Sequence, residues 1–186
     1  MKLESVINEK VEIKSEIEKL NTNFRDYLEL VFNKEFISKL DRVFKKPIIV
    51  ENFKEKSNIM ALTVEDKIFV NMKNFKELEI DRAMVYIIHE FFHVLQNIPQ
   101  FPEIKTVNRI LGDKTMKYVS KKDISRFLTG KQQNIHSNYK NEFLSYCSNN
   151  AFDWTLCPKL KEEYKRILNQ AGVFNFSSDW WKERFR

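Results

Sequence analysis

The chain has 186 residues, of which 42% are hydrophobic and 13% are aromatic, so a single domain can bury a sizeable core. It contains only three glycines and four prolines, which argues against a β-sandwich or a loop-rich fold because closely spaced turns need more of both. The formal net charge of +6 is spread along the chain, which is typical of a solvated surface. We expect an α+β fold that is mainly helical and has a small sheet.

The compartment and the redox state follow from what the sequence lacks. The first twenty residues are charged and lack the apolar core of a signal peptide, and no later stretch offers 18 consecutive apolar residues for a membrane span. The sequence therefore predicts a cytoplasmic protein with no membrane span. Cys147 and Cys157 are too few for a disulfide framework, so we expect two buried free thiols.

The first part of the chain has helical spacing. Apolar residues recur with a period close to 3.6 over residues 3–45, which predicts two helices. Asn21, Thr22 and Asn23 favour a break between them, because Asn and Thr prefer helix caps to helix interiors. We interpret residues 1–46 as a helical N-terminal extension and residues 47–186 as the main domain.

A short β region follows Pro47. Residues 48–50, 59–64 and 67–72 are rich in β-branched and apolar side chains, which predicts about three strands in a small, mostly antiparallel sheet. Glu65 and Asp66 fit a hairpin turn between the last two strands. We expect 67–72 to be an edge strand, whose free backbone groups can pair with an extended peptide.

The next segment reads as a long helix followed by a less regular region. The helix begins after Asn74 or, alternatively, at Asp81, and it ends near Ile98 before Pro99. Residues 100–137 have a mixed pattern, with Gly112 and Gly130 as turn signals. This pattern predicts loops and short helices, one of them over 123–128, that form one wall of a cleft.

Two further helices are expected near the C-terminus. Residues 139–156 have helical spacing and stop before Pro158, and residues 159–171 form an amphipathic helix that ends at Gly172. Trp180 and Trp181 lie in a short terminal segment that we interpret as a plug docked on the core.

The sequence His89-Glu90-Phe91-Phe92-His93 carries the clearest chemical signal. Positions i and i+4 of a helix share one face, so His89 and His93 can present their imidazole nitrogens to a single Zn²⁺. Glu90 lies beside them, where it can accept a proton from a metal-bound water and act as general base. The flanking apolar residues predict a buried helix, in which two imidazoles and a carboxylate are costly unless a metal or a hydrogen-bond network engages them.

A catalytic zinc site needs a third protein ligand and an open position. Glu142 is the preferred candidate because it begins the next strong helical segment, and His136 is the alternative. Tyr139 is a candidate donor to the developing oxyanion, a role that His136 fills if it is protonated.

The residues His89-Glu90-x-x-His93 resemble the signature of the zincin metallopeptidases. Asn141-Glu142-x-x-Ser145 is similar to the motif that supplies the third ligand in thermolysin-like gluzincins. The resemblance covers residues 59–156 and implies zinc-dependent hydrolysis of peptide bonds. The chain has Tyr146 where the gluzincin pattern has an aspartate that orients a ligand histidine, so that role falls to Ser145, Asn149, Asn150 or Asp153.

A second hypothesis is a catalytically inactive zincin-fold regulator that binds protein or nucleic acid. It depends on the basic segment 114–131, which carries six Lys and Arg residues against Asp123. A third is a helical interaction module with an accidental motif. The favoured prediction is a zinc metallopeptidase whose partner is a peptide or protein substrate.

Overall fold

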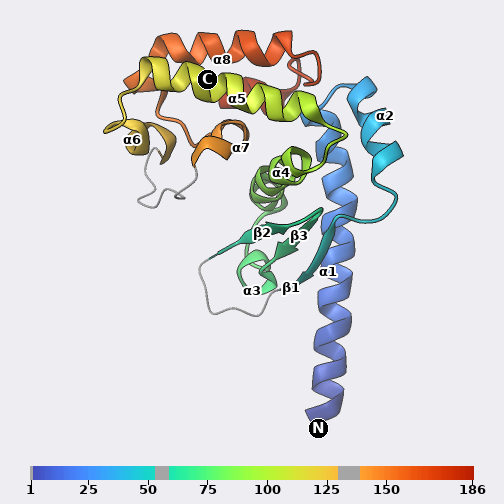
Figure 1. Ribbon diagram of the computed structural model, residues 1–186. Coiled ribbons are helices and arrows are strands. Elements are labelled where there is room, and N and C mark those ends of the chain that lie inside the picture. The colour runs from blue at the N-terminus through green and yellow to red at the C-terminus, as the bar shows by residue number, and fades with distance from the viewer. Residues whose placement is uncertain (1, 53–58, 130–138) are drawn as a thin grey trace.

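The computed structural model describes residues 2–52, 59–129 and 139–186. Figure 1 shows α4 in the middle of the molecule, with the sheet on one side, α5 and α8 stacked on the other, and the long α1 running alongside. The elements are α1 (Lys2–Val31), α2 (Lys34–Val43), β1 (Ile49–Asn52), β2 (Ala61–Val64), β3 (Lys67–Val70), α3 (Met72–Phe75), α4 (Ile80–Asn97), α5 (Pro102–Tyr118), α6 (Ile124–Thr129), the 3₁₀ turn η1 (Tyr139–Asn141), α7 (Phe143–Ser148), the 3₁₀ turn η2 (Trp154–Leu156), α8 (Pro158–Gln170) and α9 (Asp179–Arg184).

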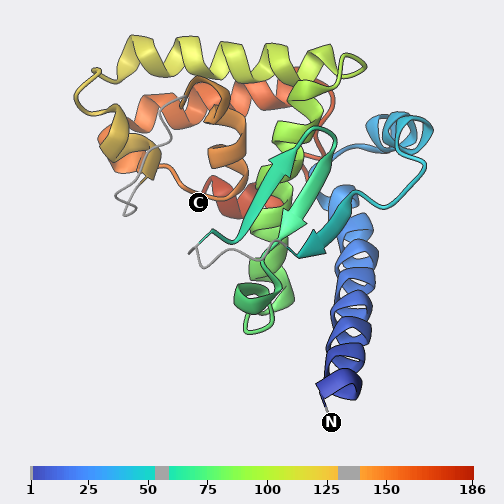
Figure 2. The same cartoon turned by 60° about the horizontal axis from the view of Figure 1, so that its bottom comes forward.

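The predicted α+β fold, mainly helical with a small sheet before the histidine-bearing helix, is confirmed. The sheet has the order β1-β3-β2, as Figure 2 shows from a second side. β2 and β3 form the expected antiparallel hairpin, and Glu65 in their turn has a φ of 56°. β1, which precedes the hairpin in the sequence, pairs in parallel with β3 on the side of β3 away from β2.

The position of β3 corrects one prediction. The strand that we expected at 67–72 lies in the centre of the sheet, between β1 and β2, so it is not an edge strand. Among the described strands β1 and β2 are the two outer ones, and of these it is β2 that lies against α4. The strand that can offer backbone groups near the histidines is therefore β2.

The predicted break at Asn21 to Asn23 is wrong, because α1 continues unbroken to Val31. The three polar side chains each bond back to the carbonyl four residues earlier, at 3.0, 3.0 and 2.8 Å, so they are satisfied inside the helix. The chain breaks instead at Asn33, whose side chain accepts a hydrogen bond from the amide of Phe36 and caps α2.

The region expected to be loops and short helices contains the 17-residue helix α5, so that part of the prediction is wrong. Gly112 lies inside this helix rather than in a turn. A Cβ atom at Gly112 would lie 2.8 and 2.9 Å from ring carbons of Phe143, so the absence of a side chain permits close contact between α5 and α7. The short helix predicted at 123–128 is present as α6, and Gly130 lies outside the described residues.

The single helix expected over 139–156 is also wrong, because α7 stops at Ser148. Asn150 has a φ of 56°, and the amides of Asn150 and Ala151 bond to the carbonyls of Cys147 and Tyr146 at 3.4 and 3.0 Å. These two bonds form a Schellman motif, in which a residue with left-handed backbone angles ends the helix and the amides that follow bond to the last free carbonyls of the helix.

The C-terminal predictions hold. α8 ends before Gly172, which has a φ of 67°, and both tryptophans of α9 are buried, with Trp181 fully inaccessible. Both cysteines are free thiols, as expected, but only Cys147 is buried, since Cys157 is partly exposed. Within the described ranges, no helix combines the length and the apolar character needed to cross a bilayer.

Candidate metal centre

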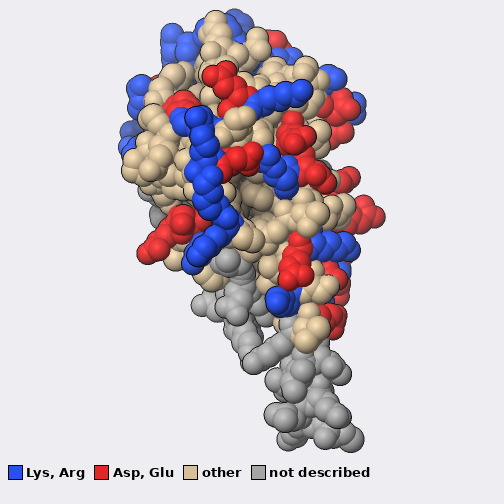
Figure 3. All heavy atoms as spheres, turned by 90° about the vertical axis from the view of Figure 1, so that its right-hand side faces the viewer, with Lys and Arg blue, Asp and Glu red and all other residues tan. Residues whose placement is uncertain are grey.

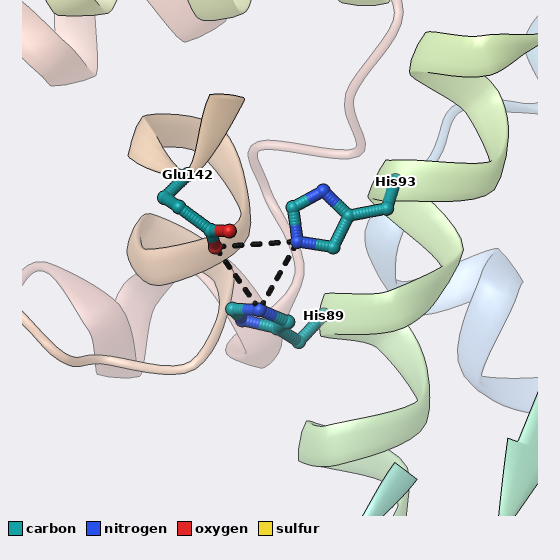
Figure 4. Close-up of side chains that lie close together, drawn as sticks. All are labelled: His89, His93 and Glu142. Carbon is teal, nitrogen blue, oxygen red and sulfur yellow. Dashed lines mark hydrogen bonds and ion pairs between the residues drawn. The ribbon is translucent and has the colours of Figure 1, made fainter. Parts of the chain in front are cut away.

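Three side chains meet at one point between α4 and α7 (Figure 4). The Nε2 atoms of His89 and His93 lie 3.3 Å apart, and Oε2 of Glu142 lies 3.3 Å from the first and 3.2 Å from the second. All three side chains are mostly buried, with 10–19% of their surface exposed. The structure thus brings together the two histidines and the glutamate that the sequence singled out.

The size of this triangle suits a zinc ion. Ligand atoms about 2.0–2.1 Å from a tetrahedral zinc lie about 3.3 Å from one another. The three measured separations, 3.2 to 3.3 Å, match that spacing. Two imidazoles and one carboxylate are also a donor set found in catalytic zinc sites, which leaves a fourth position for water or substrate.

Helix α4 fixes the two imidazoles. His89 and His93 lie one turn apart on the face turned toward α7, while Phe91 and Phe92 between them are fully buried. Phe91 packs edge-on against Phe24 of α1, with ring centroids 5.0 Å apart. The aromatic anchors prevent α4 from rotating, so the histidines have one available direction.

The third candidate ligand, Glu142, is held by a contact from α5. Glu142 lies at the N-cap of α7, and the buried Asn108 of α5 clamps the chain on both sides of it. The Asn108 side chain donates to the carbonyl of Lys140 at 2.8 Å and accepts from the amide of Leu144 at 3.0 Å. One amide side chain therefore sets the position of the ligand carboxylate.

The electrostatics of the site favour positive charge beside Glu142. Burial alone would raise the pKa of the Glu142 carboxyl, but His89 and His93 outweigh burial and hold that pKa well below its ordinary value. Burial lowers the pKa of His93, yet Glu142, assisted by Glu90, raises it overall. A bound cation would take the place of the proton that this arrangement attracts.

The orientation of His89 depends on Asn149. The amide nitrogen Nδ2 of Asn149, at the C-cap of α7, lies 3.0 Å from Nδ1 of His89. With this amide turned by 180°, Oδ1 takes the place of Nδ2, accepts the Nδ1 proton and leaves the Nε2 lone pair free for a metal. Of the four candidates for the role of the missing aspartate, Asn149 is the one in contact with a ligand histidine.

Glu90 is positioned by the outer strand. The hydroxyl of Thr63 in β2 lies 2.8 Å from Oε2 of Glu90 and 2.9 Å from its carbonyl oxygen. Because Thr63 holds the carboxylate, Glu90 is oriented by the sheet and not by the metal ligands. Glu90 also contributes to raising the pKa of His93, so its charge lies close enough to act on the site.

Most of the buried polar atoms without partners belong to the two elements that form the triangle. Among the described residues, five buried side-chain atoms lack a hydrogen-bond partner, and four of them belong to α4 or to α7 and its caps: Nε2 of Gln96, Oε2 of Glu142, Oγ of Ser145 and Oδ1 of Asn149. Orphaned buried groups are costly, and one of these atoms, Oε2 of Glu142, is a corner of the triangle, where a bound ion would engage it.

Two candidate residues cannot be placed. His136 lies outside the described residues, so it is not placed relative to the triangle. The backbone of Tyr139 begins η1, three residues before Glu142, but its side chain also falls outside the described part. Tyr146, in contrast, lies against His89 with ring centroids 5.5 Å apart, and burial together with Glu142 raises its pKa to about 12.

Sequence reasoning missed Thr63 and Asn108. Neither residue belongs to a motif, and their partners lie 27 to 36 positions away in the sequence. Comparison with known proteins adds no further constraint, since no family model, no curated protein and no solved structure matches the chain.

Proposed function

We propose that this chain is a zinc-dependent peptidase of the zincin type, with His89, His93 and Glu142 as metal ligands. The observation that carries the proposal is the triangle of ligand atoms, 3.2 to 3.3 Å on each side, with Glu90 on the same helix beside it. The resemblance of the two motifs to gluzincins supports the same assignment.

When bound, zinc would supply Lewis acidity that activates a water and polarises a carbonyl oxygen. Glu90 takes a proton from the attacking water and returns it to the leaving nitrogen, while Thr63 keeps the carboxylate in place. Asn149, with its amide turned so that Oδ1 faces Nδ1 of His89, would hold this histidine in the tautomer that can ligate. Tyr139 stays a proposed donor to the oxyanion.

The substrate that fits this site is an extended peptide or protein segment. β2 pairs only with β3 among the described strands, and it contacts the general base through Thr63. An outer strand offers free backbone amides and carbonyls, to which an extended segment can add as a further strand. We propose that β2 aligns the scissile bond with Glu90.

Metal analysis tests the ligand set. The purified protein, reconstituted with zinc and dialysed, is expected to hold one equivalent, and Glu142→Ala is expected to lose it. Glu162→Ala is the matched control, since Glu162 lies on α8 with 70% of its side chain exposed. Glu142 is not a ligand if its variant retains zinc and His136→Ala loses it, and a parent protein without zinc refutes the metal site itself.

Turnover tests the role of Glu90 separately. We expect Glu90→Gln to keep zinc and to cleave a denatured protein or a peptide library about 10²- to 10⁴-fold more slowly. Glu79→Gln, an exposed change just before α4, is the control and should behave like the parent. A zinc-loaded parent that cleaves no peptide but binds DNA in a salt-sensitive way would favour the regulator hypothesis instead.

A further inference from the structure

A second hollow lies on the opposite side of α4 from the histidines, between α1 and α2. It has a volume of about 190 Å³, and its apolar walls are Phe24, Leu28, Leu40, Phe44, Ile48 and Phe91. Figure 3 looks onto this side of the molecule, where uncharged surface forms a depression among Lys, Arg, Asp and Glu side chains.

The apolar wall of this hollow offers a water molecule few hydrogen-bond partners. Asn21 is the one polar side chain in the inner wall, and it already bonds to the carbonyl and the amide of Ile49 at 2.9 and 3.2 Å. None of the buried side-chain atoms without partners belongs to a lining residue. Walls of this kind favour an apolar occupant over water.

The mouth of the cavity is charged and carries a net positive charge. Arg25 and Asp41 face each other there at 2.8 Å and largely neutralise one another. Lys46 also lines the mouth, is exposed, and has no ion-pair partner among the side chains that the structure describes. An anionic group at the mouth would therefore lie near the ammonium group of Lys46, which no described carboxylate neutralises, and near the guanidinium group of Arg25.

The volume sets the size of the occupant. A cavity of roughly 150 Å³ binds benzene, so 190 Å³ accommodates one ring with a small substituent or a chain of about six carbons. We propose that this cavity binds a small carboxylic acid with an apolar body, its carboxylate at Lys46 and its body against Leu40 and Phe91. This site is independent of the proposed peptidase function, although Phe91 belongs to the helix that carries both histidines.

Hexanoate is a suitable probe, and 1-hexanol is its uncharged counterpart. Methyl-group NMR spectra of the full chain should show saturable shifts at Leu28, Leu40 and Ile48 when hexanoate is added in the millimolar range. Hexanol should cause weaker shifts at the same methyl groups, because it lacks the contact with Lys46.

Charge reversal at the mouth tests recognition of the acid without disturbing the core. We expect Lys46→Glu to weaken hexanoate binding by about tenfold and to leave hexanol binding unchanged. Lys45→Glu is the matched control, since Lys45 is the adjacent exposed lysine and does not line the cavity. Leu40→Phe, which fills part of the hollow, should weaken both ligands.

Two results would overturn the proposal. If neither compound shifts the three methyl signals, the cavity is not a binding site. If hexanol binds as well as hexanoate and Lys46→Glu changes neither, the site does not recognise an acid.

Discussion

Replacing Asn108 by alanine should make the position of Glu142, the proposed third metal ligand, less well defined, although Asn108 makes no bond to Glu142 itself. Asn108 is 4% exposed, and its side chain makes the two hydrogen bonds that clamp the chain on either side of Glu142. The variant leaves the amide of Leu144 and the carbonyl of Lys140 without their partner. The amide of Leu144 is buried, so the loss of its partner costs about 1–3 kcal/mol, whereas the carbonyl of Lys140 belongs to an exposed residue and its bond contributes about 1 kcal/mol. We therefore expect the free energy of unfolding to fall by about 2–4 kcal/mol.

The effect on zinc is the more specific consequence. Residues that orient a ligand from outside the coordination shell typically cost 10- to 100-fold in metal affinity when they are removed. We expect a loss in that range for Asn108→Ala, because Glu142 is then no longer held at a fixed distance from His89 and His93. Urea unfolding of the metal-free protein and competition with a chromogenic zinc chelator measure the two effects separately.

Thr115 provides the matched control on the same helix. It is equally buried, but its hydroxyl lies 2.6 Å from that of Tyr164, on the side of α5 that faces α8. Thr115→Val should therefore lower stability and leave zinc affinity unchanged. If Asn108→Ala lowers zinc affinity no more than Thr115→Val does, the clamp does not position Glu142 and the reasoning fails.

Gly112→Ala should lower the free energy of unfolding by up to about 2 kcal/mol, because the clash with the buried ring of Phe143 outweighs the helix propensity gained; a more stable variant in urea unfolding would contradict this. Thr63→Val should lower kcat with zinc affinity unchanged, and Thr63→Ser should recover activity because it restores the hydroxyl that holds Glu90; equal kcat in both variants would show that the contact is not used. Burial raises the pKa of the Cys147 thiol, so a thiol reagent should modify one cysteine in the native protein and two in urea; rapid native reaction of both would refute the burial.

Local patterns in the sequence were enough to predict the two histidines of the candidate site. The helix α4 and the common face of His89 and His93 follow from a 3.6-residue period, which acts over a few residues. Glu142 could be proposed from its motif and its place on the next helical segment. The sequence does not predict the distance between α4, which carries the histidines, and α7, which carries Glu142. That distance depends on how both helices pack against α5.

The errors have a common physical origin in contacts between distant residues. Gly112 has a low helix propensity and was interpreted as a turn, but its contact with Phe143 makes it suitable inside α5. Asn21 looked like a helix break, yet its side chain is satisfied by Ile17 within the helix and by Ile49 of β1. Propensity describes a residue alone, and tertiary contacts decided both cases.

The misplaced edge strand has a different cause. The alternation of side chains shows that residues 67–70 form a strand, but it does not show which strands lie on either side. β1 crosses to the free side of β3 and makes β3 central, which leaves β2 next to α4. The strand order thus decides which backbone edge lies beside Glu90, and strand order is a property of the whole fold.

The two halves of the metal triangle differ in how they are stabilised. The histidines lie in a helix of 18 residues with a fully buried apolar face, whereas α7 has six residues and would be marginal alone. α7 is buried along its whole length and is also held at its ends, by Asn108 at its first turn and by Arg184, whose Nε donates to the carbonyl of Ser148 at 2.5 Å. Because a zinc site requires its ligands within a few tenths of an ångström, we expect these end contacts to affect zinc affinity even though neither residue belongs to the proposed ligand set.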